Sequence, residues 1–353
     1  MKKVILAFDS FKGCITAQEA CQAAALGVHA VWPDAVTSEI PLSDGGEGLV
    51  KCIQQILPTQ LVNLKVHGPL MQPIEATYAL SPDGETAYME MAAASGLPLV
   101  PLEQRDPTKT TTYGVGEMLA DAMHRGCKHI IMGIGGSATC DAGRGMIDAL
   151  KANHCLNTDC KVTVACDVSN PLFGPNGAAY IFAPQKGATP EQVEWLDLQL
   201  RAFDKETIKA GIATPDLAEY PGAGAAGGLG FALLAYLKAE LHSGINIVLN
   251  LVNFEAAIKD ADLVITGEGK SDHQTLMGKV PQGVLTMSQK AGVPVWLLSG
   301  AIEDASGLLK QHFNLIKSIN EGDNRELSEL MKPQIAKENM TKTITRLMQN
   351  SNV

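Results

Sequence analysis

Positive charge is scarce in this chain of 353 residues. It has 28 lysines and arginines against 38 aspartates and glutamates, which gives a formal net charge of -10. Proteins that bind nucleic acid or an anionic membrane need a basic face, so this balance disfavours both as partners. An anionic substrate has to be drawn in by a local cluster of lysines, arginines and backbone amides.

The chain also lacks the spacing motifs of a structural zinc site and the long apolar run of a membrane span. Its cysteines include no C-x-x-C pair, and its histidines form no H-x-H or H-x-x-x-H cluster. No apolar run reaches the roughly 18–20 residues that cross a bilayer. The first residues lead directly into a short apolar strand rather than a signal peptide. We therefore expect a cytoplasmic protein with reduced cysteines that serve as small core residues.

Glycine, by contrast, is plentiful and is concentrated in five loops. Most of these loops lie at the end of an apolar run or the start of a helical one, where backbone N–H groups and the helix dipole favour anions. Three loops carry acidic residues, which suit Mg²⁺ rather than phosphate. The five loops are Asp9-Ser10-Phe11-Lys12-Gly13, Asp44-Gly45-Gly46-Glu47-Gly48, Gly135-Gly136-Ser137-Ala138-Thr139, Gly222-Ala223-Gly224-Ala225-Ala226-Gly227-Gly228 and Gly267-Glu268-Gly269-Lys270. Together they indicate phosphoryl chemistry on a small molecule.

The apolar runs predict two α/β domains, one inserted into the other. Buried strands followed by loops and helices occur near both ends of the chain, which is the rhythm of a parallel sheet. Residues 60–95 alternate in strand fashion and predict an antiparallel meander instead. Thr16, with Glu19 three residues on, predicts a capping box at the start of a helix. Further helices are expected over 226–240 and over about 325–350. We therefore expect residues 1–65 and 246–353 to form one discontinuous, doubly wound domain and residues 66–245 to form an inserted α/β domain.

The first two glycine loops place carboxylates and a lysine after predicted strands. Asp9 suits Mg²⁺ or a substrate hydroxyl and Lys12 suits a phosphate or carboxylate, although an ordinary turn with solvated side chains fits equally well. Asp44 and Glu47 suit metal binding or general-base work on a hydroxyl. The alternative for that pair is an acidic helix start favoured by the dipole.

Three segments in the middle of the chain carry further candidates. Gly136 and Ser137 follow a buried strand and offer amides and a hydroxyl to an oxyanion, with close packing of strand on helix as the alternative. Asp167 ends another strand, where catalytic carboxylates collect, and Lys186 lies in a turn, where most lysines are only solvated. Gly224 belongs to a stretch of small residues that allows close approach to a ligand, tight helix packing or a hinge.

The stretch from Thr266 to Lys279 is the strongest candidate for binding nucleotide phosphates. It combines glycines, two lysines and two carboxylates at the end of a strand, and Lys279 serves as a point charge. A polar loop without a ligand is the alternative. The expected site residues within it are Gly267, Glu268, Gly269, Lys270 and Asp272.

Seven segments of the chain, taken in order, resemble the bacterial glycerate kinase family (type I). They are Asp9-Ser10-Phe11-Lys12-Gly13, Asp44-Gly45-Gly46-Glu47-Gly48, Ile134-Gly135-Gly136-Ser137-Ala138-Thr139, Ala165-Cys166-Asp167-Val168, Pro184-Gln185-Lys186-Gly187-Ala188, Pro221-Gly222-Ala223-Gly224-Ala225-Ala226-Gly227-Gly228-Leu229 and Thr266-Gly267-Glu268-Gly269. The resemblance implies ATP- and Mg²⁺-dependent phosphorylation of D-glycerate, typically to 2-phosphoglycerate. It also implies a flavodoxin-like, Rossmann-like domain interrupted by a second α/β domain.

The chain departs from the family pattern at three places. Cys140-Asp141-Ala142-Gly143 stands where the family usually has Asn-Asp-Gly-Gly, and Lys270 stands where it usually has arginine. The connection from Lys151 to Cys160 is shorter than in the family. These departures leave open a kinase for a related small hydroxy acid, and also a non-catalytic relative that senses a nucleotide or sugar acid.

The resulting hypothesis is an ATP-dependent kinase for D-glycerate, with Mg²⁺ as cofactor and its active site in the cleft between the two domains. Asp44 or Asp167 would orient or deprotonate the attacking hydroxyl, and Lys12 and Lys279 complete the catalytic set. The expected metal ligands are Asp44, Glu47 and Glu268. The expected substrate- or phosphate-binding residues are Asp9, Ser10, Gly45, Gly46, Gly136, Ser137, Lys186, Gly224, Gly267, Gly269, Lys270 and Asp272. Whether the chain forms a homodimer is left open.

Overall fold

The chain divides into two compact units, one of which interrupts the other in sequence. Unit 1 comprises Met1–Asp44 and Ile245–Val353, and unit 2 comprises Gly45–Gly244. The first boundary lies earlier than the expected one at residues 65 and 66, because strand β3 pairs along its whole length with β4 in the sheet of unit 2. The computed structural model describes residues 2–43, 48–156 and 159–350.

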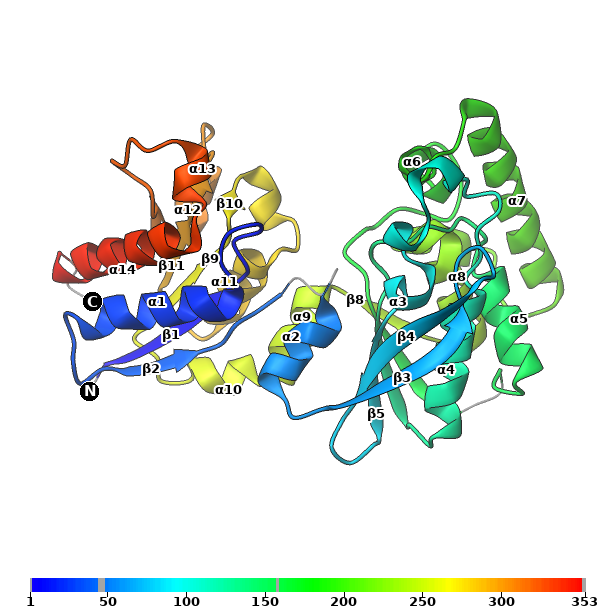
Figure 1. The fold of residues 1–353 in the computed structure, drawn as a ribbon, viewed down its shortest axis with the longest axis horizontal. Coiled ribbons are helices and arrows are strands. Elements are labelled where there is room, and N and C mark those ends of the chain that lie inside the picture. Colours follow the sequence, from blue (N-terminus) through cyan, green and yellow to red (C-terminus); the bar gives the residue numbers. More distant parts are fainter. Residues whose placement is uncertain (1, 44–47, 157–158, 351–353) are drawn as a thin grey trace. The chain divides into compact units, whose positions relative to one another are not determined.

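Unit 1 is built on a five-stranded parallel sheet (Figure 1). Numbered within the unit, its strands follow the order 2-1-3-4-5, which is the order of flavodoxin-like folds. This order confirms the predicted fold class. In spatial order the strands are β2 (Val36–Glu39), β1 (Lys3–Phe8), β9 (Leu263–Gly267), β11 (Val295–Ser299) and β13 (Leu315–Ser318).

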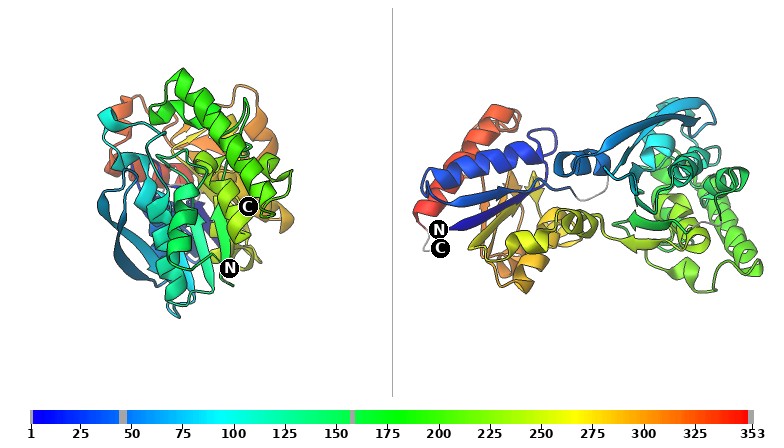
Figure 2. Two further views of the ribbon diagram at one scale, coloured as in Figure 1. Left: turned by 90° about the vertical axis from the view of Figure 1, so that its right-hand side faces the viewer. Right: turned by 90° about the horizontal axis from the view of Figure 1, so that it is seen from below.

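Helices cover both faces of this sheet (Figure 2). Helices α1 (Ala17–His29) and α14 (Pro333–Gln349) pack against each other over one face, and α11 (Val280–Lys290) packs on β1, β9 and β11. Helix α1 begins as predicted, because Thr16 and Glu19 form a reciprocal capping box. The other elements of unit 1 are α9 (Gly244–Leu251), α10 (Phe254–Ile258), β10 (Lys270–Ser271), β12 (Ala301–Ile302), α12 (Leu308–His312) and α13 (Leu327–Leu330).

Unit 2 contains a six-stranded mixed sheet in the order β3-β4-β5-β6-β7-β8. The first three strands form the predicted antiparallel meander, and β5 to β8 run parallel. The buried strands β6 and β7 end where the glycine-rich loop at 134–139 and the segment at 166–168 begin. The strands are β3 (Gln60–His67), β4 (Pro73–Leu80), β5 (Thr86–Glu90), β6 (His129–Gly133), β7 (Lys161–Ala165) and β8 (Glu240–His242).

The helices of unit 2 surround an apolar core that runs from the meander to the longest helices. Helices α4 and α5 pack closely on each other, as do α6 and α7. The helices are α2 (Leu49–Ile56), α3 (Ala92–Ser95), α4 (Tyr113–His124), α5 (Arg144–Ala152), α6 (Ala178–Phe182), α7 (Pro190–Lys209) and α8 (Ala225–Leu237).

Two predicted helices differ from the observed ones. The helix expected over about 325–350 is divided into α13 and α14, because Pro333 occupies the first turn of α14 and cannot continue a preceding helix. The helix expected over 226–240 is not regular at its start, since residues 226–228 have left-handed backbone angles. It also ends at Leu237, before β8.

No helix in the described part of the chain is both long and apolar enough to cross a membrane.

Candidate active site

Each unit carries a pocket at the carboxyl ends of its parallel strands. The unit 2 pocket has a volume of about 460 Å³ and is lined by the segments that follow β6 and β7. The unit 1 pocket has a volume of about 560 Å³ and is lined by the segments that follow β1, β9, β11 and β13. Ligands of open parallel sheets bind at this edge.

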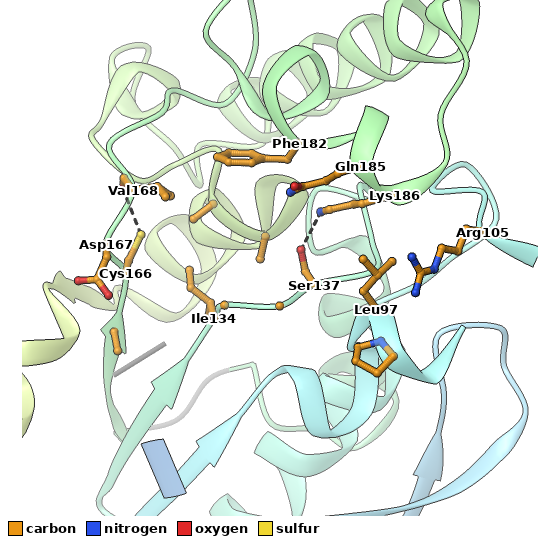
Figure 3. A pocket seen from close by; sticks show the side chains of 16 residues that line it. Leu97, Arg105, Ile134, Ser137, Cys166, Asp167, Val168, Phe182, Gln185 and Lys186 are labelled. Atoms are coloured by element: carbon orange, nitrogen blue, oxygen red, sulfur yellow. Dashed lines mark hydrogen bonds between the residues drawn. The ribbon is translucent and has the colours of Figure 1, made fainter. Parts of the chain in front are cut away.

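Lys186 is the buried cation of the unit 2 pocket. Its side chain donates to Ser137 Oγ at 2.7 Å and to the carbonyl oxygen of Thr139 at 2.6 Å (Figure 3). Only 3% of the residue is exposed, and burial lowers the pKa of its ammonium group to about 8. The sequence predicted a binding role for Lys186 and Ser137, and the structure brings both into one pocket.

A left-handed glycine holds Lys186 in place. The turn Pro184–Lys186 ends at Gly187, whose φ is +96°. A β-carbon at Gly187 would lie 2.2 Å from the carbonyl oxygen of Arg105, so only glycine permits this approach. The turn that carries Lys186 is therefore packed directly against the backbone of Arg105.

Arg105 lines the same pocket and was not predicted as a site residue. It follows the short helical turn Leu102–Gln104, and its Nε is buried without a hydrogen-bond partner among the described residues. In sequence it lies in a polar loop, where an arginine is ordinarily solvated. No local pattern marks it as part of a site.

Asp167 follows β7 and lines the unit 2 pocket, as its place after a strand predicts. The residue is exposed, and its Oδ1 accepts a hydrogen bond of 2.9 Å from the backbone of Gly244. In Figure 3 it lies at the opposite end of the pocket from Arg105. The preceding Cys166 has a thiol pKa raised by burial, which disfavours the reactive thiolate.

The unit 1 pocket lies at the point where the strand order of the flavodoxin-like sheet reverses. Asp9 follows β1 and Glu268 follows β9, the two strands that flank this point. Backbone amides and polar side chains meet at such a switch point, which is where ligands of these sheets bind. The pocket therefore contains the expected residues Asp9, Ser10, Lys12, Glu268, Gly269, Lys270 and Lys279.

Glu268 is buried within a set of hydrogen bonds. Its Oε1 accepts from the hydroxyls of Ser271 at 3.1 Å and Thr275 at 2.7 Å, and its Oε2 lies 3.5 Å from Lys279 Nζ. Burying a carboxylate costs less free energy when such hydrogen-bond and ion-pair partners are present. Lys270, in turn, lies 2.8 Å from Glu303, and this hydrogen bond raises the lysine pKa.

One side of the unit 1 pocket is mainly apolar. Leu327, Leu330 and Met331 of the α13 region line it, together with Ile319 and the amide of Asn320. An apolar slot beside several lysines suits a ligand with a flat apolar part and a charged part.

Three expected binding residues line neither pocket and have structural roles. Gly267 lies inside β9, where a β-carbon would lie 1.6 Å from the carbonyl oxygen of Leu298. A β-carbon at Gly224 would lie 2.1 Å from the carbonyl oxygen of Pro171. Asp272 caps the short helix His273–Leu276.

Four expected residues, Asp44, Gly45, Gly46 and Glu47, lie outside the described residues. Among the described residues no three histidines, cysteines, aspartates or glutamates gather as a metal-ligand set.

The segment Cys140-Asp141-Ala142-Gly143, which departs from the family pattern at Cys140 and Ala142, has a structural role. Cys140 is buried in the core of unit 2. Asp141 Oδ2 accepts from the backbone and the hydroxyl of Thr112, both at 2.8 Å. Asp141 therefore anchors the glycine-rich loop rather than facing a ligand.

Comparison with known proteins shows which family the chain is similar to. A family model described as the glycerate kinase family matches residues 4–158 and 152–352. A glycerate 2-kinase of Escherichia coli (strain K12) is 43% identical over 90% of this chain and 91% of its own. A glycerate kinase of Bacillus subtilis (strain 168) is also 43% identical, over 88% of each chain.

The fold also matches a solved structure. A crystal structure of a protein assigned as glycerate kinase 2 from Salmonella typhimurium LT2 has a TM-score of 0.84 and 38% identity, and the match covers 99% of this chain and 98% of the other. These matches extend over nearly the whole chain and both units. The chain therefore belongs to the glycerate kinase family.

Proposed function

We propose that this protein transfers the γ-phosphoryl group of ATP to D-glycerate and releases 2-phosphoglycerate and ADP. Family membership supports the reaction class, and the relative from Escherichia coli is named as a glycerate 2-kinase. The observation that carries the proposal is the pair of pockets at the carboxyl ends of parallel strands. The unit 1 pocket is lined by three lysines with Asp9 and Glu268, and the unit 2 pocket by Lys186 and Arg105 with Asp167.

The nucleotide is assigned to the unit 1 pocket. Its apolar wall suits the adenine ring, and Lys12, Lys270 and Lys279 suit the phosphates. The position at the switch point of a flavodoxin-like sheet supports the same assignment. Catalysis of phosphoryl transfer is mostly positioning and neutralisation of charge, which is the part these lysines play.

Mg²⁺ fits the same pocket. Asp9 and Glu268 are buried carboxylates that line it, and Mg²⁺ in kinases is held by one or two carboxylates together with substrate phosphates. Asp9 and Glu268 would hold the ion, and Asp44 and Glu47 stay predicted ligands. When bound, Mg²⁺ neutralises phosphate charge.

Asp167 is assigned to the acceptor. Its carboxylate accepts the proton of the glycerate hydroxyl as the hydroxyl oxygen attacks the γ-phosphorus and ADP leaves. The bond between the γ-phosphorus and the bridging oxygen breaks as the new P–O bond forms.

The cellular setting belongs to the same proposal. All eight cysteines are free, as in proteins of a reducing compartment. We assign the protein to the cytoplasm on this ground. A homodimer stays a prediction for solution measurement.

A coupled ADP-release assay tests the function directly. ATP, Mg²⁺ and a panel of D-glycerate, L-glycerate, lactate, tartronate and glycerol are offered to the purified chain. D-Glycerate should stimulate ADP release at least tenfold more than the other acceptors. If another hydroxy acid is preferred, the substrate is wrong. Intact ligand binding without turnover on any acceptor would instead favour a sensor.

A further inference from the structure

Two cationic side chains in the unit 2 pocket form no ion pair within the described part of the chain. Neither Arg105 nor Lys186 forms an ion pair with a carboxylate among the described residues, although the chain as a whole carries a formal net charge of -10. The Lys186 ammonium has three N–H donors and the described residues accept two of them. Arg105 Nε has no acceptor among those residues. Lys186 is buried, whereas Arg105 is half-buried with its Nε enclosed. A charge withdrawn from water without a partner is costly, so a structure that retains these two cations points to a ligand.

The fold holds these two cations together from two directions. The turn of Lys186 packs on the carbonyl oxygen of Arg105 through Gly187. On the other side, Asp106 Oδ1 accepts from the Gln192 side chain at 3.2 Å, which ties the Arg105 segment to the start of α7. The arrangement is therefore fixed before any ligand arrives.

Backbone amides of the glycine-rich loop add to the positive character. The N–H groups of Gly135, Gly136 and Ser137 have no acceptor in the described part of the chain, and all three residues line the pocket. The loop itself is anchored, because Thr110 Oγ1 donates to the carbonyl oxygen of Ala138 at 2.9 Å. Consecutive unpartnered amides in a loop with a left-handed glycine are a recurring binding site for anions.

We propose that Arg105, Lys186 and the amides of residues 135–137 form an oxyanion-binding site that holds an anionic group of a substrate. This inference rests on the proposed kinase reaction for the identity of the ligand, which is the carboxylate of glycerate; a phosphate of the nucleotide bound here would overturn the assignment of the nucleotide to the unit 1 pocket. A carboxylate is planar and a phosphate group is tetrahedral, and a guanidinium binds either oxyanion through two parallel N–H donors. The site lies away from Asp167 in the same pocket, so it positions the ligand rather than the reacting proton.

The experiment uses Arg105→Gln, Arg105→Lys and the matched control Arg125→Gln. Arg125 is an arginine of the same unit that lies outside the unit 2 pocket and pairs with Asp121. Dissociation constants for D-glycerate, for a non-hydrolysable ATP analogue and for inorganic phosphate are measured by calorimetry, and KM and kcat by the coupled assay.

Arg105→Gln should weaken phosphate binding and raise the dissociation constant and KM of one substrate at least tenfold, with kcat changed less than threefold. Arg105→Lys should recover part of the lost affinity, because lysine keeps the positive charge but lacks the paired N–H donors of the planar guanidinium. A rise confined to glycerate identifies the carboxylate as the ligand, and a rise confined to the ATP analogue identifies a phosphate. Arg125→Gln should match the parent.

If Arg105→Gln binds all three ligands within twofold of the parent while keeping the parent's unfolding midpoint, the oxyanion site is wrong. The binding measurements need no turnover. An inactive parent whose phosphate binding still depends on Arg105 would therefore refute the proposed reaction and retain the oxyanion site.

Discussion

Lys186 carries its charge where water hardly reaches it. Burial lowers its pKa to about 8, and the two groups that oppose this shift by their charge are Cys140 and Asp141. The lysine is therefore protonated at neutral pH and becomes neutral within the range of an ordinary assay. A surface lysine keeps its charge to about pH 10.4.

We predict that affinity for the anion bound at Lys186 falls above pH 8. Only the protonated lysine attracts an anion, so kcat/KM for that ligand should be level below pH 8 and fall about tenfold per pH unit above it. Lys186→Arg should remove this fall of kcat/KM above pH 8, because arginine stays protonated over the whole range, even if the activity of the variant is lower. A parent profile that stays level to pH 10 would contradict the role of Lys186.

Asp167 is the residue that the proposal places at the reacting hydroxyl. Asp167→Asn should lower kcat roughly 10²- to 10⁴-fold with little change in KM, because asparagine can still accept from Gly244 but cannot take a proton. Asp83→Asn is the matched control, since Asp83 lies in the β4–β5 turn and lines neither pocket. A kcat for Asp167→Asn within fivefold of the parent would assign the base elsewhere.

At the scale of elements, the sequence predicts the positions of the inner strands better than it predicts the roles of the glycines. The apolar runs predict each inner strand because parallel strands are buried on both faces. The capping box predicts the start of α1 because its two hydrogen bonds are local. The sequence predicts Gly224 and Gly267 as ligand-binding residues, yet each lies against a carbonyl oxygen of a segment distant in sequence. Local sequence does not reveal such a contact.

The candidate site residues that could be predicted are those that directly follow a strand. Asp9, Glu268 and Asp167 follow strands, and strand ends of one parallel sheet meet at one edge. Arg105 follows no strand and reaches its pocket only because the turn at Gly187 packs on it. Such a placement depends on tertiary packing alone.

Two glycines of one loop should therefore respond differently to alanine. Gly267→Ala should destabilise the protein by roughly 3 kcal/mol or more, because its β-carbon would overlap the carbonyl oxygen of Leu298 in the neighbouring strand. Gly269→Ala meets only ordinary contacts of 3.4 Å and should cost under about 1 kcal/mol. Urea unfolding of both variants measures the difference, and equal midpoints would show that the strand spacing adapts.

At the scale of the whole molecule, the lysines of this acidic chain lie both inside and outside the two pockets. Lys279 lies at the start of α11 beside Glu268, whereas Lys290 of the same helix is exposed and lines neither pocket. The proposed nucleotide site depends on the first of these lysines and not on the second.

Lys279→Ala should raise the KM for ATP at least tenfold and leave the calorimetric affinity for glycerate within twofold of the parent. Lys290→Ala is the matched control and should change neither. The reason is that Lys279 supplies positive charge to phosphates in the unit 1 pocket. A loss of glycerate affinity alone would move the acceptor to unit 1 and overturn the assignment of the two pockets.

The transfer of the γ-phosphoryl group of ATP to D-glycerate is tested most directly by ³¹P NMR of ATP, Mg²⁺ and D-glycerate incubated with the purified chain. The γ-phosphate resonance of ATP should disappear as one phosphomonoester resonance grows in equal amount. That new resonance should show the coupling to a single proton expected of 2-phosphoglycerate. Consumption of ATP to inorganic phosphate alone, or an unchanged ATP spectrum, would contradict this transfer.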